Sequence, residues 1–189
     1  MWSLRCGWRP SSWEMEEVAA RVVAWCSQVG GLYPELSEWR FTAGSKRAAL
    51  ATPVVTEHEL VRRVVAKAGI ASIWAPQGDL SAHISADDYA KQENMFRFSA
   101  TGSLPGAVDE DDEDVAMAMA EMACRIFSPE YVNCGKQVGL GPMLDDGSLV
   151  KAVNYARRDA YDSYPDFVRA ARVIRTTEEG VFFARPDHD

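Results

Sequence analysis

The chain contains 189 residues, of which 47% are hydrophobic and 25% are charged. This composition is that of an ordinary globular protein, and it excludes wholesale disorder, collagen-like sequence and coiled-coil rods. The sequence has no uncharged apolar run of about 18 residues, so we expect no membrane-spanning helix. The N-terminal residues also lack the apolar core of a secretory signal, which favours a cytoplasmic protein.

The net charge of −8 is concentrated in one part of the chain. Acidic and basic residues balance over residues 1–108, with 11 of each, and again over 151–189, with 7 of each. The negative charge therefore comes from six consecutive acids at 109–114 and from an excess of two acids over 115–150. Because the sequence has no basic stripe, it is poorly suited to binding nucleic acid or an anionic membrane. A basic protein partner fits this charge better.

Residues 1–70 are predicted to be mainly helical. Ser11 and Glu14 have the spacing of a capping box, and apolar residues then recur every three or four positions as far as Val29. The glycine pair that begins at Gly30 is expected to end this helix. These features predict one amphipathic helix in the first third of the chain.

A second capping box, Thr56 with Glu59, predicts another helix that reaches about Ala68. From residue 71 to 100 the apolar period changes to two, which indicates antiparallel strands with one polar face. The apolar face would carry Leu80, Ala82 and Ile84, and the polar face Ser81, His83 and Ser85.

The remaining elements are predicted in a mixed order. They are an acidic loop at 101–114, a central helix at 115–127, an irregular segment at 128–147, a strand at 148–156, a helix at 165–175 and a last strand at 181–184. Helices, then a meander, then mixed elements indicate an α+β fold. We expect a layer of helices packed on a largely antiparallel sheet, in a single domain of residues 1–189.

The acidic run is the first candidate functional feature. It does not fit an EF-hand calcium loop, which needs glycine at its sixth position. Two interpretations remain open, a solvated helix N-terminus and a docking surface for a basic partner. The candidate binding residues are Asp109, Glu110, Asp111, Asp112, Glu113 and Asp114, together with Asp145 and Asp146.

The sequence carries no recognisable catalytic motif. It contains no nucleophile elbow and no phosphate-binding loop, and no lysine follows an acid at the two-residue spacing of metal-dependent nucleases. Among the histidines, only His83 lies in a predicted strand, where Asp87 or Asp88 could join it in a pocket. We therefore expect no enzymatic activity, no cofactor and no metal, with a small enzyme acting near His83 as the alternative.

The cysteines and tryptophans have simpler interpretations. Cys6, Cys26, Cys124 and Cys134 show no metal-ligand spacing, so they are expected to be reduced thiols that are mostly packed. Most of the six tryptophans are expected in the core, and an exposed subset would suit a binding protein.

Several segments resemble immunity protein family 52. In the first half they are Trp8-Arg9-Pro10, YPELSEW at 33–39, GSKRAAL at 44–50, Ile73 and Trp74, LSAHIS at 80–85 and Asn94. In the second half they are DDGSLVKAV at 145–153 and YPDFVRAARVIR at 164–175. The chain departs from the family pattern in the acidic run and in residues 128–147.

The resemblance implies a non-enzymatic protein that binds one toxin. Members of the family protect bacteria against polymorphic, often type VI secreted, toxins of the restriction-endonuclease fold. The implied partner is a cognate nuclease toxin with a basic cleft, bound in the cytoplasm. A structural adaptor without a toxin partner is a further alternative, and the sequence leaves the binding surface and the oligomeric state open.

Overall fold

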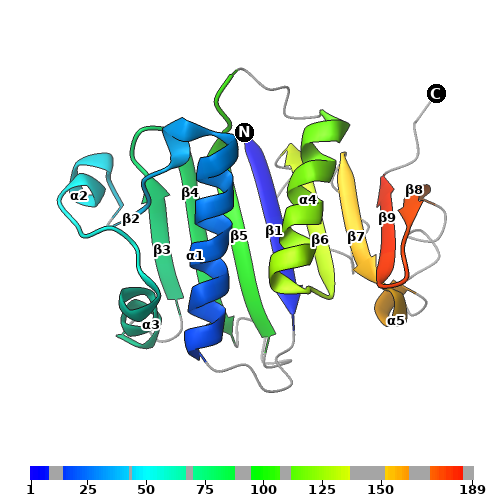
Figure 1. The fold of residues 1–189 in the computed structure, drawn as a ribbon, viewed down its shortest axis with the longest axis horizontal. Helices are drawn as coiled ribbons and strands as arrows, with labels where there is room; N and C mark the ends of the chain where they lie inside the picture. Colours follow the sequence, from blue (N-terminus) through cyan, green and yellow to red (C-terminus); the bar gives the residue numbers. More distant parts are fainter. Residues whose placement is uncertain are drawn as a thin grey trace. The chain divides into compact units, whose positions relative to one another are not determined.

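The structure is a computed structural model, and it describes residues 1–8, 15–42, 44–66, 70–87, 95–106, 112–136, 152–161 and 171–184. These residues form an α+β domain, the class that the sequence predicted, and they contain five α-helices and nine strands (Figure 1). The chain groups into two compact units, which are described one at a time. The first unit is Gly7–Ala107, and the second consists of Met1–Cys6 and Val108–Asp189.

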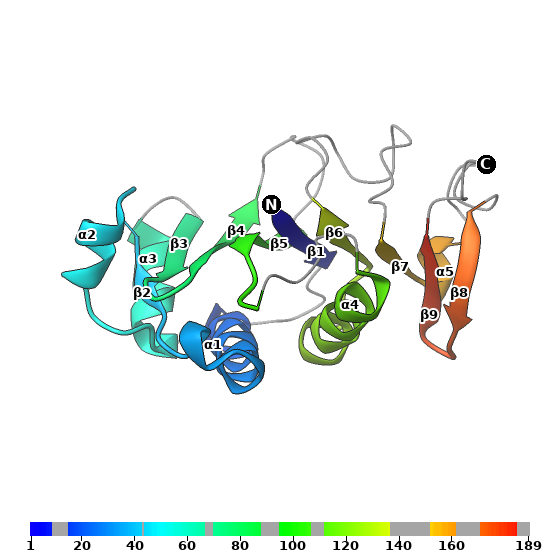
Figure 2. The same cartoon turned by 90° about the horizontal axis from the view of Figure 1, so that it is seen from above.

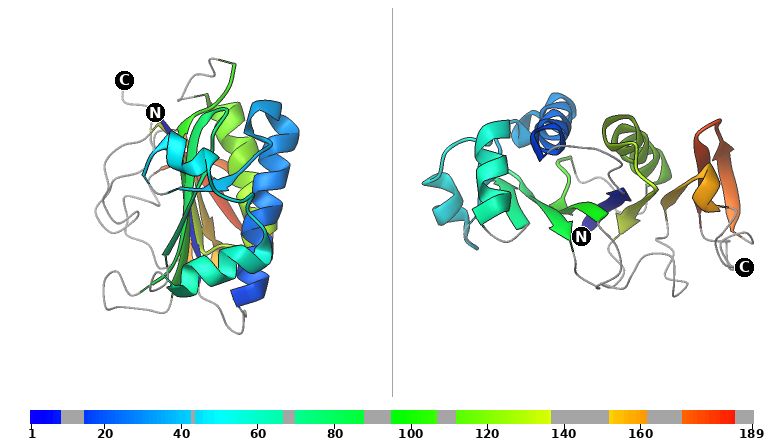
Figure 3. Two further views of the ribbon diagram at one scale, coloured as in Figure 1. Left: turned by 90° about the vertical axis from the view of Figure 1, so that its left-hand side faces the viewer. Right: turned by 90° about the horizontal axis from the view of Figure 1, so that it is seen from below.

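The first unit contains a four-stranded antiparallel arrangement in the order β2-β3-β4-β5. The strands are β2 (Arg40–Phe41), β3 (Ile70–Ala75), β4 (Asp79–Asp87) and β5 (Met95–Ser103). The helices are α1 (Met15–Leu32), α2 (Lys46–Leu50) and α3 (Glu57–Ala66), with a 3-10 turn η1 (Pro34–Leu36). Figures 2 and 3 show α1 and α3 on the same side of β3, β4 and β5.

The core of the first unit lies between these helices and the strands. Each strand buries alternate residues, as its period of two predicted. The buried hydrophobic strand residues are Phe41, Ala71, Ile73, Ala75, Leu80, Ala82, Ile84, Phe96, Phe98 and Ala100. The helices bury Val18, Val22, Trp25 and Val29 from α1 and Leu60 and Val64 from α3. The opposite side of the strands therefore carries the polar residues of the alternation.

The second unit has the strand order β1-β6-β7-β9-β8. Its elements are β1 (Trp2–Trp8, of which Trp2–Cys6 belong here), α4 (Glu113–Phe127), β6 (Tyr131–Lys136), β7 (Val153–Arg157), α5 (Arg158–Tyr161), β8 (Arg172–Thr176) and β9 (Gly180–Ala184). Neighbours among β6, β7, β9 and β8 are antiparallel. Helix α4 contacts β6 and β7 and buries Met119, Met122, Ile126 and Phe127.

Three parts of the sequence adopt a structure other than the predicted one. Residues 2–8 form a strand rather than part of a helical region, and the irregular segment 128–147 contains β6. The predicted helix at 165–175 is wrong in its described part, because residues 172–176 form β8 and pair with β9. The helical spacing of apolar residues there is overridden by strand pairing.

The ends of the predicted elements also shift. Helix α1 continues through Gly30 to Leu32 instead of ending at the glycine pair. A Cβ at Gly30 would lie 2.8 Å from Cα of Ser37, so the glycine permits close packing against the turn that follows. The acidic loop is shorter than predicted, because β5 extends to Ser103 and α4 begins at Glu113. The Ser11–Glu14 capping box lies outside the described residues.

Candidate functional site

The described part of the acidic run caps helix α4. Oδ1 of Asp112 accepts hydrogen bonds from the backbone N–H groups of Asp114 at 3.0 Å and Val115 at 3.2 Å. These are two of the donors that a helix N-terminus leaves unsatisfied. The carboxylate of Glu113 forms an ion pair with Arg172 of β8. Asp112 and Glu113 therefore have structural roles.

The other acids predicted to bind a partner are only partly placed. Asp114 is exposed on the first turn of α4. Asp109, Glu110 and Asp111 lie outside the described residues, as do Asp145 and Asp146. A toxin-binding role for this set stays a prediction.

A second ion pair joins α4 to β8, the strand that pairs with β9. The carboxylate of Glu121 pairs with the guanidinium of Arg175, which also lies over the ring of Phe182 at 4.9 Å. Tyr155 packs against Phe182 with ring centroids 4.9 Å apart, and burial raises the pKa of Tyr155 to about 12. The phenol is therefore protonated at neutral pH and serves packing.

The cysteines are unsuited to nucleophilic chemistry. Cys6, Cys26 and Cys134 are buried, which confirms that most of the thiols are packed. Burial raises the thiol pKa of Cys26, Cys124 and Cys134. Because the thiolate is the reactive form, these three groups are inert at neutral pH.

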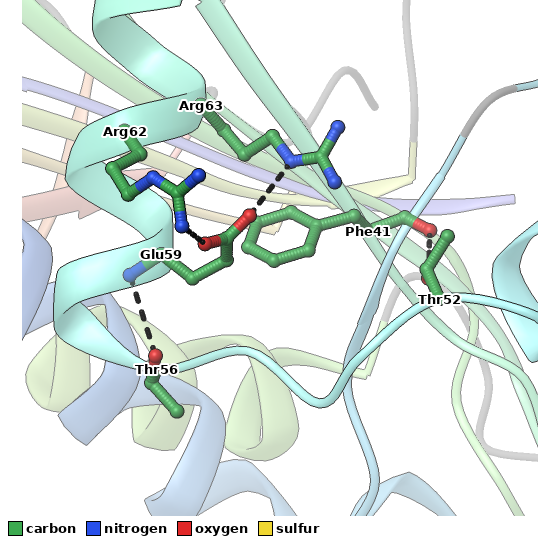
Figure 4. Close-up of polar contacts among 6 residues, drawn as sticks. All are labelled: Phe41, Thr52, Thr56, Glu59, Arg62 and Arg63. Carbon is green, nitrogen blue, oxygen red and sulfur yellow. Dashed lines mark hydrogen bonds and ion pairs between the residues drawn. The ribbon is translucent and has the colours of Figure 1, made fainter.

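A polar cluster connects α3 to β2 in the first unit (Figure 4). Thr56 accepts a hydrogen bond from the Glu59 N–H at 3.3 Å, which confirms the predicted cap. The Glu59 carboxylate bridges Arg62 at 2.9 Å and Arg63 at 3.1 Å, while Arg63 lies 5.0 Å from the centroid of the Phe41 ring. Both arginines are thus paired with an acid within α3, and the cluster has a structural role.

His83 lies on β4, on the side of the strands away from α1 and α3. Its Nδ1 is 2.8 Å from Oγ of Ser72 on the neighbouring strand β3. Partial burial lowers the pKa of His83, so the ring is neutral at pH 7. Asp87 ends β4, and Asp88 lies outside the described residues. The structure thus pairs His83 with a serine that the sequence did not single out.

His83 belongs to a larger surface, which we call the polar sheet face. Strand register aligns its members in two lines that run across β3, β4 and β5. Trp74 is opposite Ser81, which is opposite Thr101, and Ser72 is opposite His83, which is opposite Ser99. Together with the pair Ser85 and Arg97, the face consists of Ser72, Trp74, Ser81, His83, Ser85, Arg97, Ser99 and Thr101.

All eight residues of the polar sheet face are half-buried or exposed, with His83 and Arg97 the most open. Hydroxyl groups both donate and accept hydrogen bonds, and short side chains lose little entropy when they are fixed. Trp74 adds apolar area and Arg97 adds a charge with five donors. This surface is equipped for recognition of another molecule.

The alternation of the sequence predicted the serines and His83 on an exposed face, but not a binding surface. The alternation also placed Arg97 on the polar side of its strand, while Ser72 and Trp74 were missed, although their place in the same alternation was an available signal. Within the described ranges, no three histidine, cysteine or acidic side chains are grouped to hold a metal ion. The described helices also include none with the length and apolar character to cross a bilayer.

Comparison with known proteins gives a similarity in fold. The chain matches no family model and no curated protein. Among solved structures, it is similar to the Pseudomonas aeruginosa T6SS protein PA0821, with a TM-score of 0.51 and 11% sequence identity. The match covers 97% of this chain but only 64% of the other, so this chain spans less than two thirds of that protein. The two chains therefore have a similar fold, and at 11% identity the comparison concerns the fold alone.

Proposed function

We propose that this protein is an immunity protein that binds a bacterial nuclease toxin and neutralises it in a non-covalent complex. The observation that carries the proposal is the polar sheet face, which offers short hydroxyl groups, a tryptophan and an arginine on one exposed surface. Antibody paratopes use the same combination of adaptable polar groups and rigid aromatic anchors. A binding role does not require a catalytic group.

The fold supports a link to type VI secretion. The similar structure is that of a T6SS protein. The segments that resemble immunity protein family 52 lead to the same setting, since members of that family act against toxins of such systems. The compartment in which a nuclease toxin would be met is the cytoplasm.

The charge of the chain supports a nuclease as the toxin. A nuclease presents a positive cleft to phosphate groups, and a partner of net charge −8 is attracted to such a cleft. The acids at 109–111 precede the helix cap at Asp112 in the sequence. In this proposal their charges speed association with a basic protein.

Co-expression tests the proposal. The genes that neighbour the one for this chain are searched for a nuclease-domain toxin, the chain is produced in bacteria together with that toxin, and surviving colonies are counted. We expect survival with this toxin and none with a toxin that attacks the cell wall. Death of the cells in both cases, with the chain present in soluble form, would refute the proposed function.

Two other functions predict different results. A small enzyme could use the contact between Ser72 and His83, and it would show turnover with ester or amide substrates that is lost in His83→Gln. A structural adaptor would leave the toxin active. Survival in the co-expression test, together with no turnover of ester or amide substrates by the wild-type protein, would favour binding over catalysis.

A further inference from the structure

Two asparagines lie directly opposite each other in the interior of the second unit, one on β6 and one on β7. Asn133 is 1% exposed, and Asn154 is fully buried. Nδ2 of Asn133 donates a hydrogen bond to Oδ1 of Asn154 at 2.7 Å. Nδ2 of Asn154 in turn donates to the backbone carbonyl of Phe183 on β9 at 3.2 Å. These two residues, which we call the amide pair, thus connect three neighbouring strands.

The amide pair lies in apolar surroundings. Ala156 is on the same side of β7 as Asn154, and it packs in an apolar cluster with Val181 and Phe183. Oδ1 of Asn133 has no hydrogen-bond partner among the residues that the structure describes. Because a buried polar group costs free energy unless its hydrogen bonds are made, an apolar pair of similar shape would be about as stable here. Stability alone therefore does not account for the amide pair.

The burial pattern of the two strands does not determine how they align. Every residue is buried from Val132 to Gly135 on β6 and from Val153 to Ala156 on β7. Where only one face of a strand is buried, a shift by one residue exposes the apolar face, and this penalty sets the register. Strands that are buried on both faces incur no such penalty. The register of β6 with β7 needs another determinant.

A tight turn does not supply this determinant. Strand β6 ends at Lys136 and β7 begins at Val153. The two strands are therefore not joined by a hairpin loop of about two to five residues, in which the geometry of the turn fixes the register. What remains is the set of side-chain contacts between the strands themselves.

A shift in register breaks the amide pair. If β7 moves by one residue relative to β6, the two asparagines point to opposite sides of the sheet. If it moves by two residues, Asn133 is opposite Ala152 or Ala156, whose methyl groups accept no hydrogen bond. Either shift separates the two amides and leaves buried donors and acceptors unpaired, which is unfavourable. The observed register is the one that places the amides directly opposite each other.

We propose that the amide pair of Asn133 and Asn154 sets the register between β6 and β7. Buried polar residues have this role in other folds, where they select one alignment out of several that apolar packing allows. The selected alignment keeps Asn154 and Tyr155 on opposite sides of β7, with Tyr155 packed against Phe182. This role of the amide pair does not depend on the proposed function.

The test compares two double variants of similar shape that differ in hydrogen bonding. Asn133→Val with Asn154→Val makes the pair apolar, whereas Asn133→Thr with Asn154→Thr supplies hydroxyl groups that can bond across the strands. Ser3→Ala is the matched control, because Ser3 is a buried polar residue of the neighbouring strand β1. Its hydroxyl donates to the backbone carbonyl of Gly135 at 3.4 Å.

Nuclear magnetic resonance of the full chain measures the register. Amide spectra show how many peaks each residue of β6 and β7 gives, and cross-strand nuclear Overhauser effects identify the residue opposite. We expect one set of peaks in the wild type, the threonine variant and the control, with Val132 opposite Tyr155. In the valine variant we expect a second set of peaks, confined to β6 and β7, in which Val132 is opposite another residue.

Every other outcome also gives a decision. A single set of peaks with the native contacts in the valine variant overturns the assignment, because shape alone then sets the register. A second set in the threonine variant or in the control overturns it as well, since hydrogen bonding within the amide pair is then not the determinant. If the valine variant does not fold, native contacts in the threonine variant support the assignment, and failure of that variant to fold overturns it. The co-expression test of the proposed function is unaffected by any of these results.

Discussion

The indole ring of Trp25 meets the ring of Phe98 edge-on, with the centroids 4.8 Å apart and the planes at 64°. Trp39 approaches the same indole at 5.7 Å. Trp25 comes from the apolar stripe of α1 and Phe98 from the buried side of β5, so this contact holds the helix on the strands. Edge-to-face pairs add about 0.5 to 1.5 kcal/mol beyond the burial of their area.

Trp25→Ala should therefore lower the free energy of unfolding by roughly 3 to 5 kcal/mol, the range for a buried tryptophan. The control is Ser27→Ala, because Ser27 is exposed on the same helix and alanine favours a helix at least as well as serine. Urea denaturation of the three proteins measures the difference. An unchanged midpoint in Trp25→Ala would mean that α1 does not pack through this ring.

The cap of α4 gives a second prediction. Asp112→Ala removes the acceptor of two backbone N–H groups and should reduce stability by about 0.5 to 2 kcal/mol. Asp112→Asn keeps a side-chain oxygen at the cap and should be nearly neutral. Thermal unfolding at neutral pH compares the two variants. Equal losses of stability in the two variants would show that Asp112 stabilises α4 through its charge rather than through its hydrogen bonds.

The sequence was most informative where one face of an element is buried. Alternation predicted which residues of β4 are buried, and the spacing of Thr56 and Glu59 predicted the start of α3. It failed for β1, where Trp2, Ser3 and Leu4 are all buried, so that the strand shows no alternation. It failed again for β8, an edge strand with mostly exposed residues and an irregular register beside β9.

The candidate surface was only partly predictable for a different reason. Ser72 and His83 are 11 residues apart, and their contact depends on the register of β3 with β4. The neighbours of Arg97 likewise depend on which strands lie beside β5. Pairings between strands are set by turns and packing, which local patterns do not encode.

His83 makes stability depend on pH. Its pKa is lowered in the folded protein by partial burial, so below about pH 6.5 the unfolded chain binds a proton that the folded chain does not. This difference lowers stability as the pH falls. Urea unfolding at pH 7.5 and pH 5.5 should show a larger loss for wild type than for His83→Gln. Equal losses would show that His83 does not contribute to this dependence.

The absence of a nuclease motif from the sequence gives a further prediction. Purified protein should cleave neither DNA nor RNA, with or without magnesium, because no lysine has an acid two residues before it. Gel assays with plasmid and with single-stranded RNA measure this. Reproducible cleavage that depends on the metal, and that copurifies with the folded chain, would contradict a purely binding role.

The acidic run gives the last prediction, because Asp112 and Glu113 have structural roles that a variant can leave in place. The triple variant Asp109→Asn, Glu110→Gln, Asp111→Asn removes three charges and leaves both the Asp112 cap and the Glu113–Arg172 ion pair in place. Stability should therefore change by less than about 1 kcal/mol. If the run attracts a basic toxin, association at low salt should slow severalfold, with the same dissociation rate.

Salt distinguishes this attraction from a direct contact. Above about 0.15 M salt the Debye length falls below about 8 Å, so the difference in association rate between variant and wild type should shrink. Surface plasmon resonance at two ionic strengths measures both rates. Slower association of the triple variant that persists at high salt would assign the run to the interface itself, and an unchanged rate at low salt would leave it with only its role in capping α4.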